Sequence, residues 1–125
     1  MRDVIATDHA PKAIGPYSQA IRANGFIFVS GQTPIDPATQ QLISGTVGEQ
    51  TERVLRNIEA ILKQAGSSMA KIVRCGVFLK DMNDFAAMNE IYAKFFPNNP
   101  PARSTIQAAR LPKDCQVEID AIALE

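Results

Sequence analysis

The chain has 125 residues, enough for one compact domain with its own core, and we treat residues 1–125 as a single domain. Thirteen basic and thirteen acidic side chains leave no net charge, and no run of Lys or Arg suits a phosphate backbone. No apolar stretch approaches the roughly 20 residues that span a bilayer, and the N-terminal residues do not resemble a signal peptide. We therefore expect a cytoplasmic protein that binds neither nucleic acid nor membranes.

Cysteine and histidine are scarce in this chain. Cys75 and Cys115 lie far apart in the sequence, and His9 is the only histidine, so no closely spaced set of metal ligands is present. We expect both cysteines to be reduced packing residues, because a domain of this size needs no disulfide. We expect no metal and no organic cofactor. Covalent catalysis by Ser30 is disfavoured, because no nucleophile-elbow pattern surrounds it.

The first elements that the sequence predicts clearly are two strands, residues 18–23 and 26–31, joined by Asn24 and Gly25. Asn-Gly is the strongest short-range hairpin signal, because both turn positions need a positive φ. Residues 26–29 carry large apolar side chains on both faces of their strand. The sheet is therefore expected to bury both of its faces.

Two helices are predicted further along the chain. The first begins at a candidate capping box, Thr46 with Glu49, and ends at Gly66. The second contains Phe85 and is stopped by Pro97. Apolar residues recur at helical spacing in both. These residues are Val54, Leu55, Ile58, Ile61, Leu62 and Ala65 in the first helix, and Phe85, Met88, Ile91, Tyr92, Phe95 and Phe96 in the second.

Between and after the helices the pattern predicts three more strands, residues 71–80, 103–110 and 116–124, the last two flanking a turn at 112–114. In the strand 71–80 we expect Ile72 and Phe78 to lie on the face opposite the helices. Six short strands and two helices indicate an α+β fold with both helices packed on one face of the sheet. The apolar opposite face would then be exposed in a single copy, which predicts self-association.

Candidate chemistry falls on the last two strands. Alternation places Arg103, Thr105 and Gln107 on one face of their strand, and Glu118 and Asp120 on one face of the next. We expect Arg103 and Glu118 to lie on neighbouring strands, where the guanidinium could bind a carboxylate and Glu118 could accept a proton beside it. From the residues alone two interpretations stay open. Arg103 holds a ligand carboxylate, or it forms a permanent salt bridge with Glu118 at an interface.

Several stretches of the chain, in order and over nearly its whole length, resemble the RidA family, also called the YjgF/YER057c/UK114 family of imine and enamine deaminases. They are AIGPYSQA at 13–20, VSGQ at 29–32, DFAAMN at 84–89 with FF at 95–96, PPARSTI at 100–106, LP at 111–112 and VEI at 117–119. The resemblance implies a chorismate-mutase-like fold with a six-stranded mixed sheet. It also implies a homotrimer whose active sites lie in the clefts between subunits.

The resemblance further implies an activity, the hydrolytic deamination of short 2-imino acids to 2-oxo acids and ammonia. Such imines and their enamine tautomers are released by amino-acid dehydratases. In this reading Arg103 binds the substrate carboxylate and Glu118 transfers protons. Thr105 stands where several family members have cysteine, so a thiol role is absent there, and backbone hydrogen bonds of this strand would bind ligand or water.

The resemblance also implies that Tyr17, Ser30 and Gly31 line the substrate cleft. From residue type alone, Tyr17 is a packed ring with its hydroxyl satisfied, and Ser30 is a hydroxyl that satisfies backbone at a strand end. An alternative function is a non-catalytic oligomeric module that binds small carboxylates such as 2-oxo acids and modulates a partner protein. RNA cleavage has also been attached to family members, but the balanced charge argues against it here.

Overall fold

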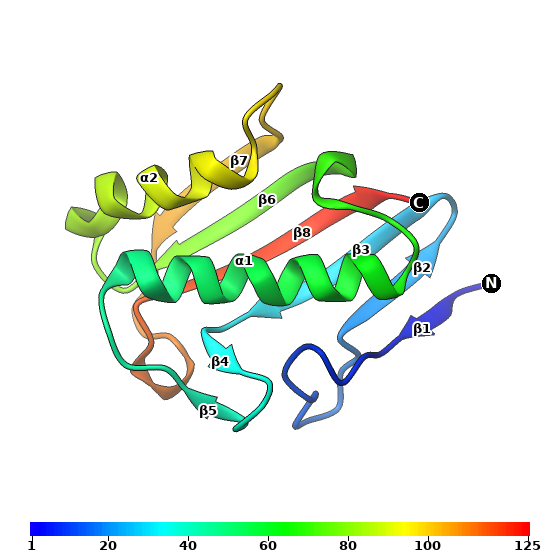
Figure 1. Ribbon diagram of the computed structural model, residues 1–125, viewed down its shortest axis with the longest axis horizontal. Coiled ribbons are helices and arrows are strands. Elements are labelled where there is room, and N and C mark those ends of the chain that lie inside the picture. Colours follow the sequence, from blue (N-terminus) through cyan, green and yellow to red (C-terminus); the bar gives the residue numbers. More distant parts are fainter.

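The computed structural model describes residues 1–125 as one twisted sheet of six strands with two helices on one face (Figure 1). The sheet strands are β1 (Asp3–Ile5), β2 (Ala20–Ala23), β3 (Phe26–Gln32), β6 (Ile72–Leu79), β7 (Ala102–Gln107) and β8 (Val117–Leu124), in the order β1-β2-β3-β8-β6-β7. The helices are α1 (Val47–Gln64) and α2 (Phe85–Phe95). Only β6 and β7 pair in parallel, so the sheet is mixed, as predicted. A small hairpin of β4 (Ile35–Asp36) and β5 (Gln41–Leu42) was not predicted.

Local signals in the sequence are confirmed where they were strongest. Asn24 and Gly25 both have positive φ, 53° and 83°, and form the turn between β2 and β3. At the start of α1, the Thr46 hydroxyl accepts from the Glu49 amide at 3.2 Å and the Glu49 carboxylate accepts from the Thr46 amide at 3.0 Å. Gly66, with φ 82°, follows the end of the same helix. Each of these features depends on contacts over a few residues only.

The core lies between the sheet and the helices. In β8, Val117, Ile119 and Ala121 are buried on the helix side, and Glu118 and Asp120 alternate with them on the other side. Both cysteines are free and buried, as predicted, Cys75 being part of the same core. Neither α1 nor α2 combines the length and the apolar character that a membrane-spanning helix needs.

One face assignment from the sequence is wrong. Ile72 is buried on the helix side rather than placed opposite it, and Val73 is 39% exposed. The pairing of β6 with β8 shifts between Ile72 and Arg74, so Val73 forms an irregularity that reverses the expected alternation at the start of the strand. Phe78 does lie on the open face, opposite Glu118 in the ladder.

The predicted adjacency of the two candidate strands is also wrong. β6 lies between β7 and β8, so Arg103 and Glu118 are not on neighbouring strands. Arg103 pairs with Cys75 of β6, and Glu118 pairs with Phe78 of β6 on its other edge. β7 has no neighbour on its outer side and forms one edge of the sheet.

No helix covers the second face of the sheet (Figure 1). This face carries exposed apolar side chains. They include Phe26, Phe28, Ile106 and Leu124, which are 36–52% exposed. This is the apolar face that the sequence predicted. A surface of this kind usually marks a contact with another protein chain.

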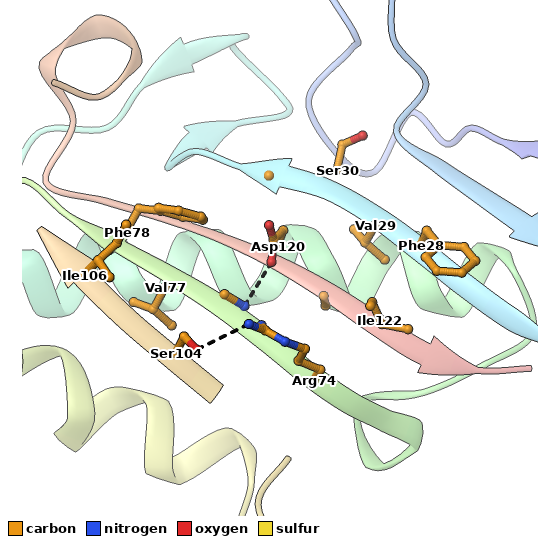
Figure 2. Close-up of a pocket in the computed structure, with 13 residues that line it drawn as sticks. Phe28, Val29, Ser30, Arg74, Val77, Phe78, Ser104, Ile106, Asp120 and Ile122 are labelled. Carbon is orange, nitrogen blue, oxygen red and sulfur yellow. Dashed lines mark hydrogen bonds between the residues drawn. The ribbon is translucent and has the colours of Figure 1, made fainter. Parts of the chain in front are cut away.

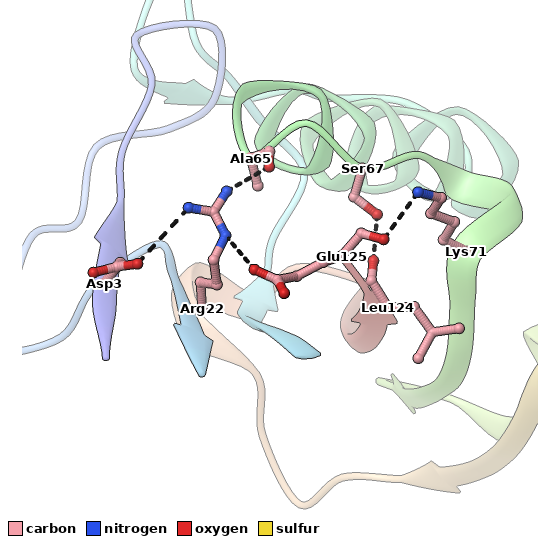
Figure 3. A network of polar contacts seen from close by, with 7 residues as sticks. All are labelled: Asp3, Arg22, Ala65, Ser67, Lys71, Leu124 and Glu125. Atoms are coloured by element: carbon pink, nitrogen blue, oxygen red, sulfur yellow. Dashed lines mark hydrogen bonds and ion pairs between the residues drawn. The ribbon is translucent and has the colours of Figure 1, made fainter. Parts of the chain in front are cut away.

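The end of the sheet remote from Glu118 is held by a polar network (Figure 3). Arg22 of β2 pairs with Glu125 at 3.0 Å and with Asp3 of β1 at 3.9 Å, and it also donates to the Ala65 carbonyl at the end of α1. The Lys71 ammonium donates to the Glu125 carbonyl oxygen at 2.9 Å. Through Arg22, these contacts connect residues near both termini to the end of α1. The candidate site lies at the other end of β8, near Glu118.

Candidate active site

A pocket of about 490 Å³ lies where β3 ends and β8 begins. Its lining includes four of the site residues predicted from the sequence, Tyr17, Ser30, Gly31 and Glu118. They come from the segment before β2, from the end of β3 and from the start of β8. The other lining residues include Lys12, Pro112 and Lys113.

Glu118 and Gly31 are in close contact at the base of this pocket. A β-carbon at residue 31 would overlap the Glu118 carboxylate, so only glycine fits there without moving it. The register of β3 against β8 shifts between Val29 and Gln32, which places Ser30 and Gly31 in a bulge. Bulges of this kind redirect side chains beside functional sites. Here the bulge, and the absence of a side chain at Gly31, let the Glu118 carboxylate lie against the backbone of β3.

The surroundings of Glu118 disfavour the charge of its carboxylate. The side chain is half-buried, and no arginine or lysine of the chain forms an ion pair with it. Burial raises the pKa of this carboxyl above its ordinary value, and the nearby charge of Asp120 raises it further. A carboxylate with a raised pKa accepts a proton more readily than an ordinary one, and the protonated group can then return it. Glu118 is therefore the group of the pocket best suited to proton transfer.

Tyr17 and Ser30 differ in how far their side chains are engaged. Residue Tyr17 is 51% exposed, so its side chain is not packed in the interior as residue type alone suggested. The Ser30 hydroxyl donates to the Ser18 carbonyl at 2.6 Å, which agrees with a hydroxyl that satisfies backbone. Ser30 therefore shapes the wall of the pocket, and its hydroxyl is already used.

Gln19 was not nominated from the sequence, although it lines the same pocket. Its side-chain amide donates to the carbonyls of Thr7 at 3.0 Å and Pro11 at 2.8 Å, and its oxygen accepts from the Thr7 amide at 2.7 Å. These bonds fix the N-terminal segment that contributes Lys12 and other residues to the pocket. Gln19 belongs to the stretch AIGPYSQA that carried the family resemblance, and that is the signal that could have pointed to it. Its hydrogen-bond partners, however, are known only once the chain has folded.

Arg103 lies elsewhere, on the helix side of β7. Its Nη1 donates to the Asn89 side-chain oxygen at 2.7 Å, and its guanidinium lies 4.8 Å from the centre of the Tyr92 ring and 5.5 Å from that of Phe85. It forms no salt bridge, so the alternative of a permanent pair with Glu118 is not formed within the chain. One chain therefore presents the cation and the carboxylate on opposite faces of its sheet.

Thr105 accompanies Arg103 on the same side of β7, as the alternation predicted. Its hydroxyl oxygen is buried and has no hydrogen-bond partner. Because β7 pairs only with β6, its outer edge is available to a ligand, to water or to another chain.

A second hollow, of about 480 Å³, occupies the open face of the sheet beside the first (Figure 2). Asp120 lies in it and accepts from the Gly76 amide at 2.9 Å, while Arg74 donates to the Ser104 hydroxyl at 3.3 Å. Apolar side chains such as Phe28 and Ile122 form its walls. Asp120 thus belongs to the open face, two residues along β8 from Glu118.

The fold and the pocket define a class, an α+β protein of the chorismate-mutase-like type with a half-buried carboxylate in a pocket of small-molecule size. Residues 7–125 match the family model described as endoribonuclease L-PSP. The chain therefore belongs to the RidA family, also called the YjgF/YER057c/UK114 family.

Relatives extend over nearly the full length. A RutC family protein of Pyrococcus horikoshii is 54% identical, with 98% of each chain covered. Human 2-iminobutanoate/2-iminopropanoate deaminase is 46% identical over 100% of this chain and 91% of its own. Among solved structures, E. coli TdcF with bound serine superimposes with a TM-score of 0.94 at 44% identity, with 98% of each chain covered.

Proposed function

We propose that this protein hydrolyses short 2-imino acids to 2-oxo acids and ammonia. The observation that carries the proposal is that neither charge is neutralised within the chain: the half-buried Glu118 has no cation beside it, and Arg103 has no acid beside it. A substrate with a carboxylate next to an electrophilic carbon would engage both. The name of the human relative and the serine bound to TdcF support a substrate of this size and class.

The two groups are too far apart in the fold to act together within one chain, because β6 separates their strands and they point to opposite faces. We propose that they meet between copies in a homotrimer. The edge strand β7 with Arg103 and Thr105 would close the pocket of Tyr17, Ser30, Gly31 and Glu118 on a neighbouring copy. The uncovered apolar face of the sheet supports such an assembly.

The reaction then needs three proton transfers, from the water, to the nitrogen and from the new hydroxyl group. Arg103 binds the substrate carboxylate and so fixes the iminium carbon against a water molecule. Glu118 takes a proton from this water as its oxygen bonds to the carbon, which converts the C=N bond to a single bond. Glu118 then returns the proton to the nitrogen. As the C–N bond breaks, the Glu118 carboxylate takes the proton of the new hydroxyl group, so the carbonyl of the 2-oxo acid forms, and the departing ammonia carries that proton away as ammonium. The backbone of β7 near Thr105 would help to orient the water.

The test is a coupled assay in which an amino-acid dehydratase generates the imine and the release of 2-oxo acid is followed. The protein should accelerate this release. Arg103→Ala should remain folded and lose about tenfold to 100-fold in substrate binding, because it loses charge-assisted hydrogen bonds. Arg56→Ala is the matched control, since Arg56 also makes one short hydrogen bond and lies 4.8 Å from an aromatic ring, but on the outer side of α1. Binding of 2-oxo acid without any acceleration would instead favour the non-catalytic module.

A further inference from the structure

Arg103 is oriented only by uncharged groups, all on one face of α2. Phe85, Asn89 and Tyr92 are spaced by four and three residues, which places them side by side along the helix. The two rings lie close to the guanidinium, and the Asn89 oxygen accepts from Nη1 at 2.7 Å. Asparagine is a poor helix former in a helix interior, so its presence there calls for a compensating role.

Three other arginines of the chain are held by carboxylates, whereas Arg74, like Arg103, donates only to uncharged groups, the Cys75 carbonyl and the Ser104 hydroxyl. Arg22 pairs with Glu125 at 3.0 Å, Arg56 with Glu59 at 3.0 Å, and Arg110 binds Asp114 through two nitrogens at 2.9 and 3.2 Å. Each of these guanidinium groups is neutralised by a carboxylate of its own chain. Arg103 is the arginine that we propose binds an anion, and its hydrogen-bond partner is the side-chain amide of Asn89.

For a guanidinium that binds an external anion, a carboxylate partner and an amide partner have different effects. A carboxylate at the position of the Asn89 amide would also orient the guanidinium, but its charge would compete with any external carboxylate. An amide oxygen and two aromatic faces attract the cation and leave its net charge uncompensated. The Arg103 guanidinium is thus held in one orientation without being neutralised.

We infer that Asn89 is a positioning residue that holds Arg103 while leaving its positive charge available to a substrate carboxylate. This inference rests on the proposed function, because it assigns to Arg103 an external anion. The role of Asn89 depends on its being neutral, and a merely structural role would not.

Two substitutions at residue 89 separate these roles. Asn89→Asp keeps the size and the acceptor but adds a negative charge beside Arg103, whereas Asn89→Ala removes the acceptor and adds no charge. We expect Asn89→Asp to weaken binding of 2-oxobutanoate, measured by isothermal titration calorimetry, by about tenfold or more and to raise KM in the coupled assay. Asn89→Ala should have the smaller effect on affinity. A packing role predicts the reverse order, because aspartate is nearly isosteric with asparagine.

Ala87→Asp is the matched control, since it adds the same charge on an exposed position of α2 two residues away. It should leave affinity unchanged. The inference is overturned if Asn89→Asp binds 2-oxobutanoate as the unaltered protein does, or if Ala87→Asp weakens binding equally. If the unaltered protein shows no Arg103-dependent binding, the proposed function fails as well. Binding that depends on Arg103 but not on the charge at residue 89 removes the inference alone.

Discussion

The Glu118 carboxylate lies against the backbone of Gly31, in the space that a side chain at residue 31 would fill. Asp120 has the same relationship with Gly76 on the other flanking strand, where a β-carbon would lie 2.6 Å from its Oδ1. The two carboxylates of β8 therefore lie over different flanking strands. Glu118 contacts Gly31 of β3, and Asp120 contacts Gly76 of β6. This arrangement separates Glu118, in the pocket, from Asp120, which accepts a backbone hydrogen bond.

Gly31→Ala should abolish most activity with little loss of stability. The added methyl would displace the end of the flexible Glu118 side chain rather than the backbone, so the fold should adjust while the proton-transfer group moves. We expect the rate in the coupled assay to fall by about a hundredfold or more, the usual contribution of a general base. Gly48→Ala on α1 is the control, because its β-carbon would make only ordinary contacts, at 3.4 Å from Ile91. Full activity of Gly31→Ala would contradict the role given to Glu118.

Asp120→Asn should change the pH dependence of activity. The charge of Asp120 raises the pKa of Glu118, in addition to the larger effect of burial. Removing that charge favours the ionised form of Glu118, so the acidic limb of kcat/KM should move to lower pH. The amide oxygen can still accept from the Gly76 amide, which keeps the local structure. Other charged residues at the pocket, Lys12 and Lys113, are untouched.

An equivalent change at Asp81, which is exposed at the turn before α2, should leave the pH profile in place. The pH profile separates this effect from a structural one, because simple loss of folding lowers activity without moving the limb. A limb that stays fixed, or moves to higher pH, in Asp120→Asn would show that Asp120 does not act on Glu118.

The capping box offers a test of stability that is independent of function. Thr46→Ala removes the hydroxyl that accepts from the Glu49 amide and should lower the free energy of unfolding by about 1 kcal/mol. Hydrogen bonds from Thr46 also lower the pKa of Glu49. A lowered pKa gives stability that is present above the ordinary value and is lost as the pH falls through the shifted one. The effect of Thr46→Ala should therefore shrink in acid.

Ser68→Ala is the matched control in the same denaturation experiments. Ser68 precedes the short 3-10 helix Met69–Lys71 and makes no side-chain capping bond, so its loss should change stability by less than about 0.5 kcal/mol. If the two substitutions lowered the free energy of unfolding equally, the capping hydrogen bonds of Thr46 would make no measurable contribution to stability.

The sequence predicted those parts of the fold that depend on neighbours in the chain. Asn24 with Gly25, and Thr46 with Glu49, act over two to four residues, and their structures follow from turn and cap chemistry. Strand order is different, because nothing near Arg103 indicates that β6 will lie between β7 and β8. The irregularity at Val73 is likewise invisible in an alternating pattern, since it is set by pairing with a distant strand.

The same distinction holds for the candidate site. Tyr17, Ser30 and Gly31 were named through a family resemblance, and Glu118 was named from its residue type and strand position as well; the fold gathers all four in one pocket. The surroundings of Arg103 were not predicted. Phe85 was assigned to the apolar stripe of the second helix, and it lies 5.5 Å from the guanidinium with 38% of its surface exposed. A helical stripe shows which residues share a face, but not whether that face meets the core or a charged group.

Mixed oligomers should show whether Arg103 and Glu118 serve one site from two copies. Arg103→Ala and Glu118→Gln should each have strongly reduced activity alone at substrate concentrations below KM. Co-expressed and purified by two different tags, mixed assemblies should regain part of the activity, because Glu118 of one variant can face Arg103 of the other. A variant that carries both changes, co-expressed with Glu118→Gln, is the control and should regain none. If the two residues act within one chain, mixing restores nothing, since every copy lacks one of them. That result would remove the shared site and the assembly proposed with it.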